Sequence, residues 1–172
     1  MARHVLLGGL LAAAVTAAGP AAAQSPKVLG NFSDWTAFTD GSGRSKVCYV
    51  ASQPKKEQGK YTRRGDTFIL VTHRPSERTR DTVEIRAGYT YKKNSDVTLS
   101  VDGRAFKLFT NAGSAWARDQ KTDTALANAM RRGDTMVIRG TSSRGTRTTD
   151  TYSLKGFTAA HRAIGKACGL TT

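Results

Sequence analysis

Hydrophobic and polar residues alternate along several segments of the chain, which is the pattern of strands that bury one face. The clearest example is 82–89, where apolar side chains occupy every second position. Segment 67–73 has apolar residues at both odd and even positions, so both of its faces are apolar, which is typical of a central strand. Asp102-Gly103 separates two further alternating runs and favours a type I′ hairpin turn. We predict strands at 34–39, 46–51, 67–73, 82–89 and 97–101, a return strand through Phe106 and Leu108, and a last pair at 135–140 and 149–154.

Two segments change from the strand period to the helical period. In the first, Thr122 or Asp123 is expected to cap the N-terminus, and Gly133 follows the last turn. The second helix is predicted to begin near Thr158. Its apolar positions recur at helical spacing and share one face: Ala160, Ala163, Ile164, Ala167 and Cys168.

The order of these elements predicts the fold class. Strands dominate, and no βαβ alternation repeats along the chain. We therefore predict a mainly β fold, an antiparallel β-sandwich or barrel-like sheet with one internal and one C-terminal α-helix. The apolar strand and helix positions should share one core, namely Trp35, Phe68, Leu70, Val83, Ile85, Leu99, Phe106, Ile138, Leu154 and Ile164.

Residues 1–23 have the pattern of a secretory signal peptide. Arg3 precedes the apolar stretch 5–18, and small residues lead to a cleavage site between Ala23 and Gln24. The apolar stretch is too short for a typical transmembrane helix, and no later segment is longer and as apolar. We expect residues 24–172 to form a single mature domain, periplasmic or secreted, with no transmembrane span.

The sequence contains two cysteines, Cys48 and Cys168. In an oxidising compartment an isolated, even pair usually forms a disulfide. The helical stripe that contains Cys168 also directs this residue toward a strand, and Cys48 lies in one. The alternative is a pair of free thiols, one of them catalytic, but the sequence has no CxxC motif and no histidine close to either cysteine. We predict a Cys48–Cys168 disulfide.

The chain is strongly basic, with 27 Lys and Arg against 13 Asp and Glu. Loss of Arg3 with the leader changes the net charge from +14 to +13. Such a charge attracts anionic surfaces, and the attraction weakens as salt rises. The expected partner is an anionic envelope component or a protein, because no nucleic-acid-binding motif is present. The predicted anion-binding residues lie in three loop regions: Lys55, Lys56, Lys60, Arg63 and Arg64; Arg74, Arg78 and Arg80; and Arg139, Arg144 and Arg147. The alternative is an ordinary solvated surface that keeps the protein soluble.

Candidate catalytic groups are few. After the leader only His73 and His161 remain as histidines, and neither has a partner at metal-ligand spacing in the sequence. The common nucleophile, zinc-protease and P-loop motifs are absent from the sequence. We therefore predict no catalytic, cofactor-binding or metal site. A carboxylate pair remains open as a hydrolase site, drawn from Asp66, Asp81, Asp119 and Asp150.

Four segments carry a family resemblance. They are Phe32–Trp35 together with Cys48-Tyr49-Val50, residues 125–141 (ALANAMRRGDTMVIRGT), residues 148–160 (TTDTYSLKGFTAA), and Cys168. Together they resemble the invasion-associated locus B family of exported alphaproteobacterial proteins, and the SLKGF segment is the most specific. Many members have a further cysteine pair before the first helix, which this chain lacks. The resemblance implies a β-rich periplasmic or surface protein, linked in some pathogens to host-cell entry, with no established catalytic residues.

Three functional classes follow from these observations. We expect a non-enzymatic envelope or surface protein that binds a protein or an anionic partner. The alternatives are a periplasmic hydrolase that uses a carboxylate pair and a structural or chaperone-like envelope factor. A contiguous positive surface favours the first class, an acid pair in one cleft favours the second, and an exposed apolar groove or unpaired sheet edge favours the third.

Overall fold

The computed structural model describes residues 25–170, and these form a mainly β structure. Eleven strands make one antiparallel sheet, with one helix inside the chain and a second helix after the last strand. The predicted fold class is confirmed. The strands are β1 (Lys27–Phe32), β2 (Trp35–Asp40), β3 (Val47–Ser52), β4 (Lys56–Gly59), β5 (Phe68–Arg74), β6 (Thr79–Arg86), β7 (Asp96–Val101), β8 (Arg104–Asn111), β9 (Ser114–Trp116), β10 (Thr135–Thr141) and β11 (Arg147–Ser153), and the helices are α1 (Gln120–Arg132) and α2 (Phe157–Ala167).

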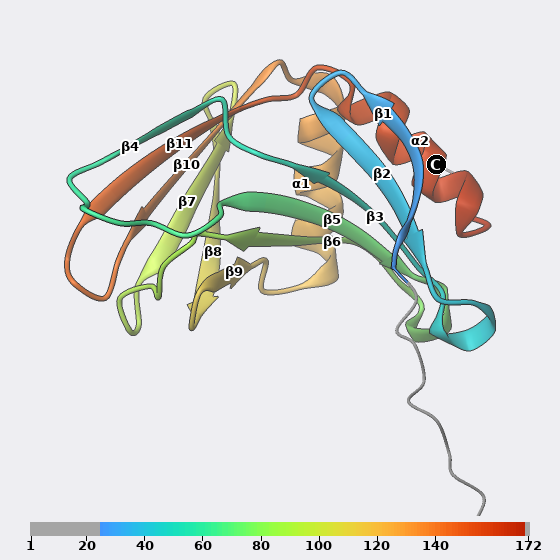
Figure 1. The fold of residues 1–172 in the computed structure, drawn as a ribbon, viewed down its shortest axis with the longest axis horizontal. Helices are drawn as coiled ribbons and strands as arrows, with labels where there is room; N and C mark the ends of the chain where they lie inside the picture. The colour runs from blue at the N-terminus through green and yellow to red at the C-terminus, as the bar shows by residue number, and fades with distance from the viewer. Residues whose placement is uncertain (1–24, 171–172) are drawn as a thin grey trace, which may run out of the picture.

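The sheet is strongly bent, and across the described residues it does not close into a barrel (Figure 1). Its strand order is β1-β2-β3-β5-β6-β9-β8-β7-β10-β11-β4. The short strand β4 pairs with β11 and not with its sequence neighbours, so β1 and β4 form the two edges. The segment from β3 to β5 therefore crosses to the far edge of the sheet and back, and this crossing places basic residues beside the β10–β11 turn.

Both helices cover the same face of the sheet. Helix α1 packs mainly on β6, and α2 packs on β1, β2 and β3. The carboxylate of Asp119 caps α1 by accepting a hydrogen bond from the Thr122 N–H at 2.7 Å, so the helix begins earlier than the predicted start at Thr122 or Asp123. Asp123 instead lies buried and accepts a hydrogen bond from the Val83 N–H at 2.9 Å, which ties α1 to β6.

The core lies between the sheet and the two helices, and eight of the ten predicted core residues belong to it. Phe68 and Leu70 do not. They are half-buried on the helix-free face, while Ile69 and Val71 point toward the core. The prediction was wrong at these two positions because strand β5 is apolar on both faces, and hydrophobicity alone cannot choose between them.

A disulfide joins Cys48 of β3 to Cys168, the residue that ends α2. The two Cα atoms are 6.0 Å apart, and the pair is the one that the sequence predicts. The Cys168 sulfur also lies 3.9 Å from the backbone carbonyl oxygen of His73 in the neighbouring strand β5. The bridge therefore fixes the end of α2 against the start of β3, beside the ends of β2 and β5.

Three sequence predictions concern the leader and the overall organisation. The predicted signal peptide, residues 1–23, lies outside the described residues. Within the described part of the chain, neither helix is long and apolar enough to cross a membrane. The assignment of residues 24–172 to a single domain remains a prediction.

Candidate functional site

Two of the three predicted basic regions lie together at one end of the sheet. The segment after β4 and the β10–β11 turn line a pocket of about 510 Å³ and an adjoining one of about 600 Å³. Lys60 and Arg144 line both pockets, Arg63 lines the first and Arg147 lines the second. We call these four residues and the two pockets the basic pocket. The segments that line it, after β4 and between β10 and β11, lie at the left end of Figure 1.

Hydroxyl groups surround the cations of the basic pocket. Tyr61 is partly exposed, and Tyr89 bonds to Thr148 through their hydroxyl oxygens at 2.6 Å. Hydroxyls and cationic side chains both donate hydrogen bonds, which suits a ligand rich in negatively charged oxygen atoms. The hydroxyl-bearing residues of the wall are Tyr61, Thr62, Tyr89, Thr90, Ser142, Ser143, Thr146 and Thr148.

Arg64 differs from the predicted role of an exposed anion ligand. Its side chain is only 3% exposed, and its two terminal nitrogens donate to the carboxylate oxygens of Asp150 at 2.6 and 2.7 Å. Its Nε donates to the Ala87 carbonyl oxygen at 2.7 Å, and Glu57 lies 3.2 Å away. Burial lowers the pKa of Arg64, but the hydrogen bonds and charge of Asp150 outweigh burial and raise it overall. Arg64 is therefore the internally paired floor of the pocket.

The third basic region lies at the opposite end of the sheet, after β5. Arg74 is 3.9 Å from the carboxylate of Glu77, and Arg80 is 4.0 Å from that of Asp81. Arg78 is exposed. The predicted anion-binding residues thus divide between two ends and do not form one continuous surface.

Three other predicted cations lie outside the basic pocket. Lys55 forms an ion pair with Asp34 near β2. Lys56 is exposed on β4, and Arg139 is exposed on β10. These residues add to the positive charge of the surface but do not line the two pockets.

Three of the four carboxylates considered for a hydrolase already have local partners. Asp150 binds Arg64, Asp119 caps α1, and Asp81 binds His161. Asp66 is exposed. These contacts join the acids to cations, a histidine or the backbone and not to one another, so they do not support the carboxylate pair of the hydrolase alternative.

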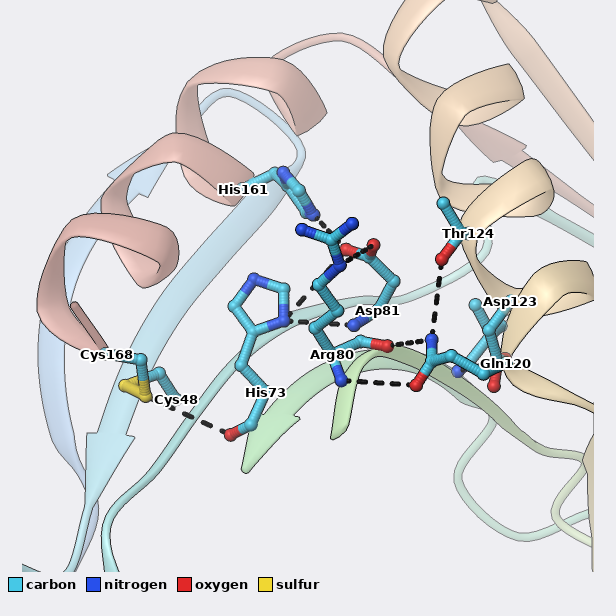
Figure 2. A network of polar contacts seen from close by, with 10 residues as sticks. Cys48, His73, Arg80, Asp81, Gln120, Asp123, Thr124, His161 and Cys168 are labelled. Atoms are coloured by element: carbon cyan, nitrogen blue, oxygen red, sulfur yellow. Dashed lines mark hydrogen bonds and ion pairs between the residues drawn. A yellow bond between two sulfur atoms is a disulfide. The ribbon is translucent and has the colours of Figure 1, made fainter. Parts of the chain in front are cut away.

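A buried cluster of His73, Asp81 and His161 was missed by the sequence analysis (Figure 2). Strand β5 contributes His73, β6 contributes Asp81 and α2 contributes His161. His161 Nε2 is 2.7 Å from Asp81 Oδ1, and His73 Nδ1 is 4.0 Å from the same oxygen. His73 Nδ1 also accepts a hydrogen bond from the Asp81 N–H at 3.0 Å. No local spacing signals this cluster, because Asp81 and His161 are 80 residues apart in the chain.

Burial sets the charge states in this cluster. It lowers the pKa of His73 to about 4, and the neighbouring His161 acts in the same direction. Burial alone would raise the pKa of Asp81, but the hydrogen bond and charge of His161 hold it below its usual value. At neutral pH the cluster therefore contains a neutral His73 imidazole and an ionised Asp81 carboxylate.

The helix-free face contains an open groove of about 910 Å³ over β2, β3, β5 and β6. Phe38 and Tyr49 stack there with ring centroids 5.0 Å apart, and Phe68 and Leu70 extend the apolar floor. Charged residues of both signs line its rim, including Asp40 and Arg86. The groove is mixed in character and has no excess of basic residues comparable with that of the basic pocket.

Comparisons with known proteins agree with the fold. The crystal structure of invasion associated protein B from Bartonella henselae is similar, with a TM-score of 0.51 and 16% sequence identity. The similarity covers 84% of this chain and 97% of that chain, and at this identity it shows a shared fold. No match was found among curated proteins. The family model of the invasion associated locus B (IalB) protein matches residues 35–165, from the start of β2 to the last turn of α2. The chain therefore belongs to this family.

Proposed function

We propose that the protein is an exported, non-enzymatic envelope or surface protein that binds an anionic partner through the basic pocket. The observation that carries this proposal is the convergence of Lys60, Arg63, Arg144 and Arg147 from two distant segments around two adjoining pockets, the first of them rich in hydroxyl groups. Charge spread evenly over a surface serves solubility, whereas charge gathered around a concave site concentrates anions there.

Ion pairing leaves these four cations available. None of the ion pairs among the described residues involves them, while the nearby acids Glu57 and Asp150 are paired with Arg64. These two acids therefore do not neutralise the four cations of the pocket, and the positive charge of the cations can attract anions from the solvent. Arg63, Arg144 and Arg147 can bind phosphate, sulfate or carboxylate in a bidentate manner, which a loose charged surface does not achieve.

Family membership and the disulfide support the exported location. A cysteine pair joined across the fold is typical of proteins that mature in an oxidising compartment. The structurally similar Bartonella protein is described as invasion associated. Anionic lipids, lipopolysaccharide and acidic glycans are the anionic surfaces that such a protein meets, and we propose this class as its partner.

Sedimentation with anionic vesicles or lipopolysaccharide across a salt series tests the proposal. The test variant combines Lys60→Gln, Arg63→Gln and Arg144→Gln. The matched control combines Arg44→Gln, Arg74→Gln and Arg78→Gln, which removes the same charge from the loops after β2 and β5 at the other end of the sheet. We expect binding by the wild type to fall as the Debye length shrinks from about 30 Å at 0.01 M to about 8 Å at 0.15 M salt.

The two triple variants separate a site from general charge. The pocket variant should lose most binding at every salt concentration, while the control should keep most of it. Equal losses in both variants would reduce the interaction to net charge. Absence of binding by the wild type at low salt would overturn the anionic-partner proposal and favour a protein partner.

A further inference from the structure

The buried cluster of His73, Asp81 and His161 has the composition of a metal-binding site. Two imidazoles and a carboxylate each offer one ligand atom, and these three atoms lie within 4.8 Å of one another. All three residues are buried, and they come from three different elements that meet under α2 (Figure 2). Nitrogen and carboxylate ligands in this ratio are typical of zinc and neighbouring transition metals, whereas calcium and magnesium prefer oxygen ligands only.

The local backbone directs Asp81 into this cluster. The β5–β6 pairing shifts register between Thr72 and Arg74, so that an extra residue of β6 lies opposite His73. Asp81 has a φ of 60°, in the left-handed region. Bulges of this kind change the direction of a side chain and are frequent next to functional sites. Here the irregularity turns the carboxylate toward His161.

Hydrogen bonding within the protein does not satisfy the two imidazoles. Only three buried side-chain atoms among the described residues have no hydrogen-bond partner, and two of them are His73 Nε2 and His161 Nδ1. The side chains of these histidines are 1% and 4% exposed. The two unpaired nitrogens are not the ring nitrogens that contact Asp81, so they are not the candidate ligand atoms. Ligation through His73 Nδ1 and His161 Nε2 makes both of them N–H donors, which need an acceptor such as a water molecule.

A small cavity gives access to the cluster. It has a volume of about 190 Å³ and is lined by the three cluster residues together with Thr124 and Asn128 of α1. A water molecule in this cavity can complete a four-coordinate shell. Arg80, Arg131 and Leu170 also line the cavity. The positive charges of these two guanidinium groups oppose a cation in the cavity, and an anionic ligand on the open side of the metal would offset them.

We propose that His73, Asp81 and His161 form a binding site for a zinc-class divalent transition metal. Zinc–nitrogen bonds of about 2.0–2.1 Å place tetrahedral ligand atoms roughly 3.3 Å apart. Metal entry therefore widens the 2.7 Å Asp81–His161 contact and draws His73 inward, while the Asp81 N–H gives up its hydrogen bond to His73 Nδ1. The bound metal links β5 and β6 to α2 beside the disulfide. This proposal is independent of the basic pocket.

Cobalt(II) titration of the untagged protein with its disulfide formed provides the test. We expect one equivalent to bind with visible ligand-field bands, zinc to displace it, and zinc to raise the thermal unfolding midpoint. Asp81→Asn and His161→Gln, which keep side-chain size and polarity, should each weaken cobalt binding on the order of 100-fold or more. Asp123→Asn is the matched control, a nearby buried acid outside the ligand set, and should leave the titration unchanged.

The wild-type measurement stands even if a variant fails to fold, because stoichiometry, absorption bands and the zinc-dependent shift need no substitution. Absence of stoichiometric binding and of any effect of zinc on unfolding would show that the cluster is a structural network. Binding that survives in folded Asp81→Asn and His161→Gln would place the metal elsewhere. Either result overturns the proposal.

Discussion

Two polar clusters in this protein, one around Arg64 and one around Asp81, differ in how completely their atoms are hydrogen-bonded. Arg64 and Asp150 are 86 residues apart in the chain, and Asp81 and His161 are 80 apart, so both pairs tie distant segments together. Around Arg64, Asp150, Ala87 and Glu57 all accept hydrogen bonds. Around Asp81, two imidazole nitrogens remain without a partner.

The difference separates a completed ion pair from a cluster that keeps unpaired polar atoms. A fully paired buried charge holds its neighbours in one arrangement, and removal of either partner leaves an uncompensated charge in the interior. In the histidine cluster the unpaired nitrogens are the ring atoms that do not contact Asp81. The first group forms the floor beneath an exposed basic pocket, and the second lies beneath a helix with a small cavity beside it.

The largest effect is expected from loss of the disulfide. It should destabilise the element that contains His161 more than the element that contains Asp150. Combined Cys48→Ala and Cys168→Ala should lower the free energy of unfolding by about 4–5 kcal/mol, because the bridge closes a loop across 120 residues. Helix α2 should lose hydrogen-exchange protection more than β11, since α2 carries both Cys168 and His161. Equal loss of protection in both elements would contradict this link between the bridge and the histidine cluster.

Substitution of Asp150 by Asn is the next largest change. It removes the charge that compensates Arg64, whose side chain is only 3% exposed, and should cost about 3–5 kcal/mol in urea denaturation. Glu57→Gln is the control, because the Glu57 side chain is 38% exposed and its contact with Arg64 should contribute less than about 1 kcal/mol. Similar losses in the two variants would show that Arg64 does not depend on Asp150 in particular.

The smallest effect concerns Asp123, the buried acid whose charge faces Asp81. Burial raises its pKa from 3.8 to about 6, so the folded state binds a proton more tightly than the unfolded state between these values. Its contribution to stability therefore falls as pH rises from about 4 to 6, and the full penalty is present at pH 7. Asp123→Asn keeps an oxygen for the Val83 N–H and should stabilise the protein by about 1–3 kcal/mol at pH 7.

Urea denaturation of the Asp123→Asn protein at pH 7 and pH 4, with a chelator present, provides the measurement. The gain should be large at pH 7 and small at pH 4, where the wild-type carboxyl is protonated in the folded state. An equal gain at both values would mean that packing, and not the buried charge, causes the effect.

The sequence predicted the parts of the fold that depend on local pattern. Alternating segments became strands, and Asp102-Gly103 forms the turn between Val101 and Arg104 with positive φ at both residues. The edge strands β1 and β4 were not predicted. Strand β4, with the sequence KEQG, is exposed at every position, and an edge strand without a buried side chain leaves no hydrophobic period to detect.

The candidate sites differ in the same way. Net charge and local clustering identified Lys60 and Arg144 as cations of interest, although not that they share a pocket. The roles of Arg64 and of the cluster around Asp81 depend on which strands become neighbours, and on a register shift that turns one side chain inward. Tertiary pairing of this kind has no counterpart in the spacing of residues along the chain.

The disulfide also determines how simple the oxidation of this chain is. With only two cysteines in the sequence, oxidation within the molecule has a single product. The Cys48 thiol is synthesised 120 residues before its partner, and during that interval no other cysteine of the same chain is available to it. An oxidase that accepts the Cys48 thiol of the unfolded chain is therefore sufficient to form the bridge, and an isomerase has no mispaired intermediate to correct.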